Sequence, residues 1–381
     1  MDDLSWQIIN PDGKYRVVVT KELPGQRWLK ILKAADCRME VSTTTHVLTA
    51  DEIHAAVGNR CDGAIGQLTE VWDAPLFKAL KKAGGRVYSN YAVGFNNVDI
   101  DAATRYGIPV GNTPGVLTET TAEMAVALTF AAARRLGEAE RFQRRGQYTG
   151  WLPSLFMGEL LFGKTLGIIG AGRIGAAYAR MMVAGHHMNL VYFDIQPNQE
   201  LEDYIRAYAA FLKQQGQPPV TCQRIDQIDD LLERADVISI HTVLDETTHH
   251  LINASRLARM QENAILINTS RGPVIDEAAL VAHCQTHPNF RAGLDVFEDE
   301  PAMKPGLVDL ENVVIVPHIA SATSWTRQGM ATLSAANLAA ILQGYPVWPN
   351  ADITPFLSDN APMAAPSILN AKELGLPYLN A

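Results

Sequence analysis

The chain has 381 residues, of which 47% are hydrophobic and 19% charged, and its formal net charge is −9. This composition is typical of a globular protein long enough for two domains, and it excludes disorder for the bulk of the chain. The acidic balance gives no general electrostatic basis for binding nucleic acid or an anionic membrane.

Short apolar runs typical of strands alternate with longer helical patterns along almost the whole chain. Runs such as LGIIG and AILINT are apolar throughout, which is typical of strands buried on both faces of a parallel sheet that helices cover. The predicted strands are residues 15–20, 64–66, 86–89, 165–169, 190–193, 237–240, 264–268, 291–296 and 313–316. The fold class is therefore α/β, with two units that each contain a parallel sheet.

Three features predict how the chain divides. The turn-rich stretch 111–115 ends the first unit near residue 117, and an apolar helix expected from about 118 to 136 opens the second unit, which runs to about 322. Residues 201–219 predict a helix and a turn inserted into the second unit, best explained as a solvated amphipathic helix. The segment after Pro346, rich in Pro, Asn and Ala, predicts a tail that wraps the surface.

A glycine-rich turn follows the predicted strand 165–169. Its sequence is G-A-G-R-I-G, and a helical pattern follows it. In a dinucleotide-binding fold, Gly170 makes the tight turn, Gly172 lets the backbone approach a pyrophosphate, and Gly175 lets helix and strand pack closely. The first turn of the helix then offers N–H groups to the phosphates.

Asp194 ends the next predicted strand, 19 residues after Gly175. In a dinucleotide-binding unit, an acidic residue at this place binds the adenosine ribose hydroxyls. Its charge repels a 2′-phosphate, and residues 195–198 contain no Arg or Lys. The sequence therefore predicts NAD(H) in preference to NADP(H). The alternative is that Asp194 only ends a strand.

Three complementary charged residues follow three successive predicted strands, at the edge where open α/β sheets bind ligands. They are Arg271 in S-R-G-P, Glu300 in F-E-D-E-P and His318 in P-H-I-A-S. Reduction of a 2-keto acid needs a cation for the carboxylate, a proton donor for the carbonyl oxygen and a carboxylate that orients the donor. Taken singly, each residue has a structural alternative, but the combination downstream of a nucleotide motif favours a catalytic site.

The chain resembles the D-isomer-specific 2-hydroxyacid dehydrogenases. The motifs that carry this resemblance are residues 170–175, 268–276, 293–297, 300–301 and 317–321. Within the family, the chain is most similar to the NADH-dependent hydroxypyruvate reductases of plants and related photosynthetic cells. That likeness covers nearly the whole chain and rests on residues 10–17, 92–99, 111–119, 178–182, 303–307 and 324–327.

The resemblance implies a role for each matching residue. Arg271 binds substrate, and Glu300 pairs with His318, which contacts both substrate and cofactor. Further cofactor contacts fall on Arg173, Ile174, Thr242, Val243, Leu244, Thr269, Asp295 and Ala320. The turn formed by Ala92, Val93 and Gly94 receives the substrate carboxylate. Trp151 of one subunit is expected to reach toward the neighbouring subunit's site, and the alternative is a core or interface tryptophan that does not contact substrate.

The resemblance also implies the architecture and the activity. The fold is two Rossmann-like domains: a discontinuous substrate domain of residues 1–117 and 323–381, and an NAD-binding domain of residues 118–322 through which a homodimer forms. The expected activity, one associated with photorespiration in plants, is reduction of hydroxypyruvate to D-glycerate, with glyoxylate reduced to glycolate as a side or shared activity.

Other functions remain as alternatives. A formate dehydrogenase would carry Gln in place of Glu300, whereas a glyoxylate or D-glycerate specialist would use the same three residues. From a different class, an NAD-sensing corepressor need not keep all three residues and the substrate turn. The absence of a G-x-S-x-G motif disfavours a serine hydrolase.

The remaining sequence features concern location and metals. The four cysteines are scattered without a C-x-x-C pair, so we expect a reducing compartment, no disulfide framework and no metal site. No apolar stretch is long enough to span a membrane. The N-terminus lacks a secretory signal, and the last three residues are not a peroxisomal tripeptide, which plant members of the family typically carry. We therefore expect a cytoplasmic enzyme whose partners are a small 2-keto or 2-hydroxy acid and a second copy of the chain.

Overall fold

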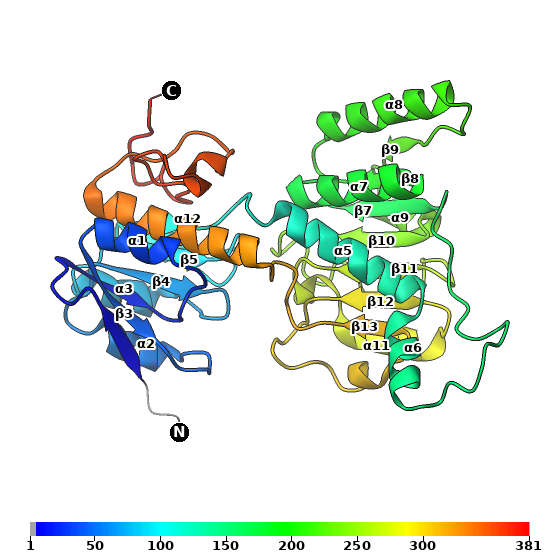
Figure 1. Ribbon diagram of the computed structural model, residues 1–381, viewed down its shortest axis with the longest axis horizontal. Coiled ribbons are helices and arrows are strands. Elements are labelled where there is room, and N and C mark those ends of the chain that lie inside the picture. The colour runs from blue at the N-terminus through cyan, green and yellow to red at the C-terminus, as the bar shows by residue number, and fades with distance from the viewer. Residues whose placement is uncertain (1–4, 381) are drawn as a thin grey trace. The chain divides into compact units, whose positions relative to one another are not determined.

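The computed structural model describes residues 5–380, and the chain divides into two compact units (Figure 1). Unit 1 comprises Met1–Leu117 and Ala322–Ala381, and unit 2 comprises Thr118–Ser321. The chain thus leaves unit 1 after Leu117 and returns to it at Ala322, one residue earlier than the sequence predicts.

Unit 1 is built on a six-stranded sheet in the order β1-β3-β2-β4-β5-β6. The strands are β1 (Trp6–Ile9), β2 (Tyr15–Val19), β3 (Cys37–Ser42), β4 (Gly63–Gln67), β5 (Val87–Tyr91) and β6 (Val110–Gly111). The helices are α1 (Arg27–Ala34), α2 (Ala50–Val57), α3 (Ala74–Lys82), α4 (Ile100–Arg105) and α12 (Ser324–Gln343), with a 3-10 turn η3 (Thr354–Leu357). All strand pairs are parallel except the edge pair β1–β3.

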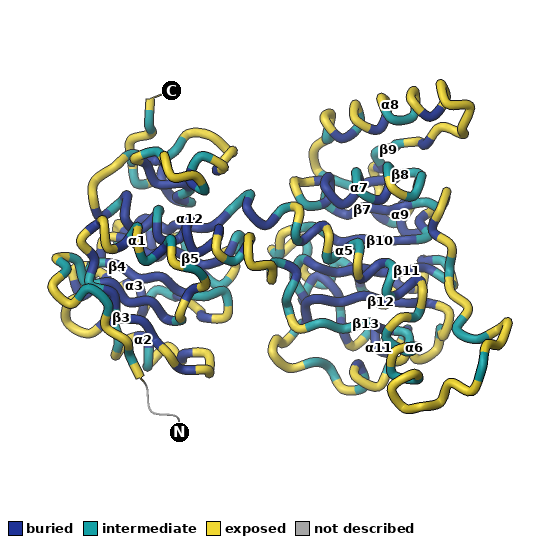
Figure 2. Tube along the Cα trace, in the orientation of Figure 1, coloured by how far each residue is buried: buried dark blue, intermediate teal, exposed yellow. Residues whose placement is uncertain are grey.

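Helix α12 is the central helix of unit 1. Thirteen of its twenty residues are buried, and it packs against α1, β4, β5 and β6. A helix that is apolar or small on nearly all sides is stable only where protein surrounds it. The burial is visible as the dark stretch of α12 in Figure 2. Helix α12 therefore contributes to the core of unit 1.

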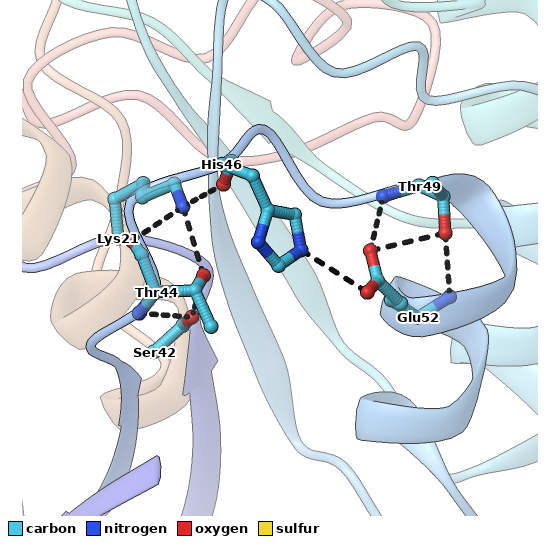
Figure 3. Close-up of polar contacts among 6 residues, drawn as sticks. All are labelled: Lys21, Ser42, Thr44, His46, Thr49 and Glu52. Atoms are coloured by element: carbon cyan, nitrogen blue, oxygen red, sulfur yellow. Dashed lines mark hydrogen bonds and ion pairs between the residues drawn. The ribbon is translucent and has the colours of Figure 1, made fainter. Parts of the chain in front are cut away.

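The loop after β3 is tied to β2 and to the start of α2 (Figure 3). The Lys21 ammonium donates to the carbonyl (2.8 Å) and hydroxyl (3.0 Å) of Thr44 and to the carbonyl of His46. Thr49 and Glu52 cap α2 reciprocally: the Glu52 N–H donates to the Thr49 hydroxyl and the Thr49 N–H to the Glu52 carboxylate. The His46 ring contacts the same carboxylate at 3.1 Å. These bonds fix the carboxyl ends of β2 and β3.

The C-terminal tail extends the sheet beside β6. Gly111 forms an antiparallel bridge with Ile368, and the Leu369 N–H donates to the Val110 carbonyl at 2.8 Å. The Asn370 side chain accepts from the Val110 N–H at 2.9 Å. The tail therefore covers the backbone groups that a two-residue edge strand would leave exposed.

Unit 2 contains a seven-stranded, all-parallel sheet in the order β13-β12-β11-β10-β7-β8-β9. The strands are β7 (Thr165–Ile169), β8 (Asn189–Phe193), β9 (Cys222–Arg224), β10 (Val237–Ile240), β11 (Ile265–Asn268), β12 (Arg291–Leu294) and β13 (Val313–Ile315). The helices are α5 (Thr118–Ala133), α6 (Leu136–Arg144), α7 (Arg173–His186), α8 (Gln199–Gln214), α9 (Ile228–Arg234), α10 (Ala254–Leu257) and α11 (Glu277–Thr286), with 3-10 turns η1 (Gly272–Val274) and η2 (Leu307–Asp309).

The strand order of unit 2 reverses at β7, which lies between β8 and β10. At such a switch point the loops after neighbouring strands diverge, and ligands bind at the carboxyl ends of the strands. The inserted segment forms α8, whose buried side chains are Leu201, Ile205 and Leu212, so the predicted amphipathic helix is confirmed. None of the helices within residues 5–380 is both long and apolar enough to cross a membrane.

Candidate active site

The glycine-rich turn lies between β7 and α7, and glycine is suited to each of its three positions for a different physical reason. Gly170 has φ +92, and a Cβ there would come within 2.8 Å of the His241 carbonyl. A Cβ on Gly175 would lie 2.1 Å from the Gly170 carbonyl. A Cβ on Gly172, the N-cap of α7, would meet nothing within 4 Å. Packing within the protein thus requires Gly170 and Gly175, whereas the open space beside Gly172 suits a ligand at the helix N-terminus.

Asp194 follows β8 and is fixed beside this turn. One carboxylate oxygen accepts from the Ala171 N–H at 2.7 Å and the other from the Gln196 N–H at 3.2 Å. The Arg224 guanidinium, at the end of the neighbouring strand β9, donates to the Asp194 carbonyl at 2.9 Å. The residues that directly follow Asp194 did not predict this cation; a basic residue that ends the next strand was the available signal.

Two threonine hydroxyls at the same sheet edge have no partner among residues 5–380. Thr242 lies shortly after β10, and Thr269 directly follows β11. In the part of the chain that the structure describes, both Oγ1 atoms are buried and make no hydrogen bond. Buried hydroxyls are almost always bonded, so these two are suited to a polar ligand. With the open helix N-terminus of α7 and with Asp194, they fit a bound dinucleotide.

Glu300 and His318 form the central contact of the site. The Nδ1 atom of His318 lies 2.8 Å from Oε2 of Glu300, and the other carboxylate oxygen accepts from the Phe297 N–H at 3.0 Å. Burial raises the pKa of Glu300, but the hydrogen bond and charge of His318, the Phe297 N–H and the charge of Arg271 together lower that pKa below its ordinary value. Glu300 is therefore ionised through neutral pH.

The backbone at His318 is held in an uncommon conformation. Its φ is +51, in the left-handed region that costs free energy for a residue with a side chain. The His318 N–H donates to the Asp295 carbonyl at 2.8 Å. The fully buried Asp295 carboxylate accepts from the N–H groups of Ile319 (2.6 Å) and Ala320 (2.9 Å). Asp295 thus anchors the His318 turn, a contact that the sequence did not reveal; its predicted contact with the cofactor stays a prediction.

Arg271 lies on a tightly packed turn after β11. The Asn268 side chain accepts from the Ser270 N–H and donates to the Arg271 carbonyl, both at 2.9 Å. A Cβ on Gly272 would lie 1.8 Å from the Phe297 carbonyl, so only glycine lets this turn pack against the segment that leads to Glu300. Burial lowers the pKa of the Arg271 guanidinium, and the charge of Glu300 opposes that effect. Asn268 stood in the motif without a predicted role, and the structure shows that it shapes the turn.

The structure places the other predicted residues as follows. Arg173 and Ile174 open α7, and Val243 and Leu244 continue the loop that contains Thr242. The turn 92–94 follows β5 in unit 1, and Trp151 lies in unit 2 with 79% of its surface exposed. The substrate roles of the turn and of Trp151 stay predictions. Within residues 5–380, no cluster of three or more His, Cys, Asp or Glu side chains is arranged to hold a metal ion.

Known proteins are similar to this chain in both fold and sequence. The family model for the D-isomer specific 2-hydroxyacid dehydrogenase NAD binding domain matches residues 126–320. The glycerate dehydrogenase of Cucumis sativus is 58% identical over 97% of this chain and 98% of its own length. The glyoxylate reductase of Korarchaeum cryptofilum is 40% identical over 87% and 94%. A crystal structure of a Thermus thermophilus protein matches with a TM-score of 0.78 and 35% identity, covering 93% of this chain and 99% of that one. The Gly170–Asp194 cofactor region and the Glu300–His318 pair thus stand in a chain that belongs to the D-isomer specific 2-hydroxyacid dehydrogenase family.

Proposed function

We propose that the protein reduces hydroxypyruvate to D-glycerate with NADH, and that it also reduces glyoxylate to glycolate. The Glu300–His318 hydrogen bond of 2.8 Å carries this proposal, because it pairs a proton donor with an ionised carboxylate at the cofactor edge of the sheet. The names of the relatives agree with it. One acts on glycerate, whose oxidation at C2 gives hydroxypyruvate, and another reduces glyoxylate.

The side chains of unit 2 divide the chemistry among them. When NADH is bound, it supplies a hydride to C2 of the 2-keto acid. Arg271 binds the substrate carboxylate through its planar guanidinium. His318 donates a proton from Nε2 to the carbonyl oxygen, since its Nδ1 is engaged by Glu300. Glu300 orients the ring and stabilises its protonated form. In the reverse direction, the neutral imidazole accepts the hydroxyl proton of D-glycerate.

Initial rates test this proposal directly. The decrease in NADH absorbance is measured with hydroxypyruvate, glyoxylate and pyruvate, each with NADH and with NADPH. We expect the highest kcat/KM for hydroxypyruvate with NADH, a lower value for glyoxylate and the lowest for pyruvate. A protein that binds NADH but turns over none of the three acids would be a nucleotide-sensing protein, and the proposed activity would be wrong.

We propose that Asp194 sets the preference for NADH over NADPH. Asp194→Ser removes the charge that repels a 2′-phosphate and leaves Arg224 beside it. We expect the ratio of kcat/KM for NADPH to that for NADH to rise roughly tenfold or more, the scale of one charge-assisted hydrogen bond. Adding Arg224→Gln to Asp194→Ser should reduce the gain with NADPH. An unchanged ratio in Asp194→Ser would show that Asp194 does not contact the ribose.

We propose that the protein is a homodimer that forms through an exposed apolar segment of unit 2. Large apolar side chains gather in residues 136–162 with 48–79% of their surface exposed: Leu136, Tyr148, Trp151, Leu152, Met157, Leu160 and Phe162. The segment is largely exposed in Figure 2. Monomeric proteins seldom expose a run of this kind, whereas dimer interfaces are apolar at their centre.

Two substitutions separate dimer formation from a contact with substrate. Leu160→Asp places a charge in the exposed apolar segment and is expected to give monomers in sedimentation velocity. Trp151→Ala should leave the dimer intact. If the indole reaches the neighbouring site, this substitution should raise KM for hydroxypyruvate several-fold, because a lost aromatic contact costs roughly 1 kcal/mol of binding free energy. If Leu160→Asp sediments as wild type, the interface lies elsewhere; if Trp151→Ala leaves KM unchanged, the indole does not contact substrate.

A further inference from the structure

The turn 92–94 of unit 1 is held by all three of its carbonyl groups. The donors are the Thr113 N–H for Ala92 (2.9 Å), the Asn112 side chain for Val93 (2.9 Å) and the Asn90 side chain for Gly94 (3.0 Å). Asn90 is fully buried and Asn112 nearly so. A backbone N–H thus sets the orientation of the peptide plane after Ala92, and two buried asparagine side chains set those after Val93 and Gly94.

This arrangement determines where the N–H groups of the turn point. In a trans peptide the carbonyl and the following N–H point in opposite directions. Since the carbonyls of Ala92 and Val93 are bonded within unit 1, the N–H groups of Val93 and Gly94 point away from those bonds. Among the described residues, neither N–H donates a hydrogen bond. Two adjacent, outward N–H groups are a site for an anionic oxygen pair.

The C-terminal tail fixes the orientation of Asn112. The Ser367 hydroxyl donates to the Asn112 side-chain oxygen at 2.6 Å, so the NH₂ end of that amide faces the Val93 carbonyl. Asn337 of α12 joins the two residues, because its amide donates to the Asn112 carbonyl (2.9 Å) and accepts from the Ser367 N–H (2.8 Å). A continuous chain of hydrogen bonds thus runs from the tail to the peptide between Val93 and Gly94.

We propose that Asn112 and Ser367 are positioning residues for the substrate carboxylate. Ser367 orients the Asn112 amide, and Asn112 keeps the Gly94 N–H directed at the carboxylate. The inference rests on the proposed function and on the prediction from the sequence that the turn 92–94 also receives the carboxylate of the 2-keto acid. It assigns to the tail a function in substrate binding in addition to covering the edge of β6.

The expected kinetic signature is a higher KM with little change in kcat. A carboxylate bound equally in the ground state and the transition state contributes to KM alone. We expect Asn112→Ala to raise KM for hydroxypyruvate about tenfold and Ser367→Ala about threefold, on the scale of one hydrogen bond lost or misaligned. The Kd for NADH should not change. Ser367→Thr keeps the hydroxyl and should therefore have the same KM as the wild type.

Ser334→Ala is the matched control. Ser334 lies on α12, is fully buried, and its hydroxyl makes no hydrogen bond among the described residues. Ser334→Ala therefore removes a buried serine hydroxyl from unit 1 that has no hydrogen-bonded link to the turn 92–94, and we expect KM to stay at the wild-type value. Thermal unfolding of every variant shows whether a change in KM follows from a loss of stability.

A second readout separates this inference from the proposed function. Oxamate, an unreactive isostere of a 2-keto acid, is titrated into the protein with NADH bound, and its Kd is measured by fluorescence. Weaker oxamate binding in Asn112→Ala and Ser367→Ala, with wild-type binding in Ser334→Ala and Ser367→Thr, supports the inference even if no 2-keto acid is turned over. Unchanged KM and unchanged oxamate Kd in Asn112→Ala would overturn it, whatever the activity of the wild type.

Discussion

Replacement of His318 by alanine is expected to lower kcat for hydroxypyruvate reduction roughly 10²–10⁴-fold, the contribution of general acid catalysis. The ring is the group that Glu300 holds at 2.8 Å, and Asp295 fixes its turn in the left-handed conformation. Without the ring, water must protonate the carbonyl oxygen. The Kd for NADH, measured by fluorescence titration, should stay close to the wild-type value, because the cofactor region around Gly172 and Asp194 is unchanged.

His54→Ala provides the control for this experiment. His54 is exposed on α2 in unit 1 and should leave kcat unchanged. A His318→Ala variant that folds, binds NADH and keeps a kcat within a few-fold of wild type would show that another group donates the proton.

Arg271→Lys is expected to raise KM for hydroxypyruvate roughly 100-fold and to lower kcat. Lysine keeps the positive charge but loses the planar fork that matches a carboxylate, and the buried position leaves little freedom to compensate. Since the ammonium still neutralises the carboxylate, the effect of Arg271→Ala should be larger. Steady-state kinetics with varied hydroxypyruvate at saturating NADH measure both constants.

Arg256→Lys is the matched control for Arg271→Lys. Arg256 is also partly buried and forms an ion pair with Asp229 at 2.9 Å, but it lies on α10, and its hydrogen bonds go to Asp229 and to the Leu251 carbonyl. We expect unchanged KM in that variant. A near-normal kcat/KM in Arg271→Ala would assign carboxylate binding to another residue.

The sequence predicted six of the seven strands of unit 2, because these strands are mostly apolar and largely buried. It missed β9, whose sequence is CQR and none of whose residues is buried. It did not predict β3, where the charged Arg38 and Glu40 interrupt the buried residues, or the antiparallel edge strand β1, which is mostly exposed. The predicted strand 86–89 corresponds to β5, but the prediction missed Asn90 and Tyr91; all five residues of β5 are buried although its sequence is VYSNY. Strands of these kinds are stabilised by contacts with distant segments, which a local pattern does not contain.

The charged residues of the candidate site were predictable because each lies in the loop that follows a strand, and such loops meet at one edge of a parallel sheet. The residues that position these charged side chains could not be predicted from the sequence. Asp295 bonds N–H groups 24 and 25 residues away, and Gly272 is required by a carbonyl of a different loop. The link from Ser367 to Asn112 spans 255 residues. These contacts depend on the distances between loops, which only the folded chain determines.

The most direct test of the account is a pair of pH profiles of kcat/KM for hydroxypyruvate, wild type against Glu300→Gln. Because the pKa of Glu300 is lowered, its carboxylate is charged through neutral pH and loses that charge only as the pH falls through the lowered pKa. Across neutral pH it therefore stabilises the protonated imidazole that reduction requires. Reduction takes up a proton and should slow as the pH rises, while oxidation of D-glycerate, which releases a proton, should become faster over the same range.

Glu300→Gln keeps the shape of the side chain and removes its charge, so the alkaline fall in the reduction rate should move to lower pH. Oxidation of D-glycerate should rise at correspondingly lower pH in the same variant. A fall at the same pH in both proteins would contradict the account, because the carboxylate would then have no influence on the proton that His318 donates.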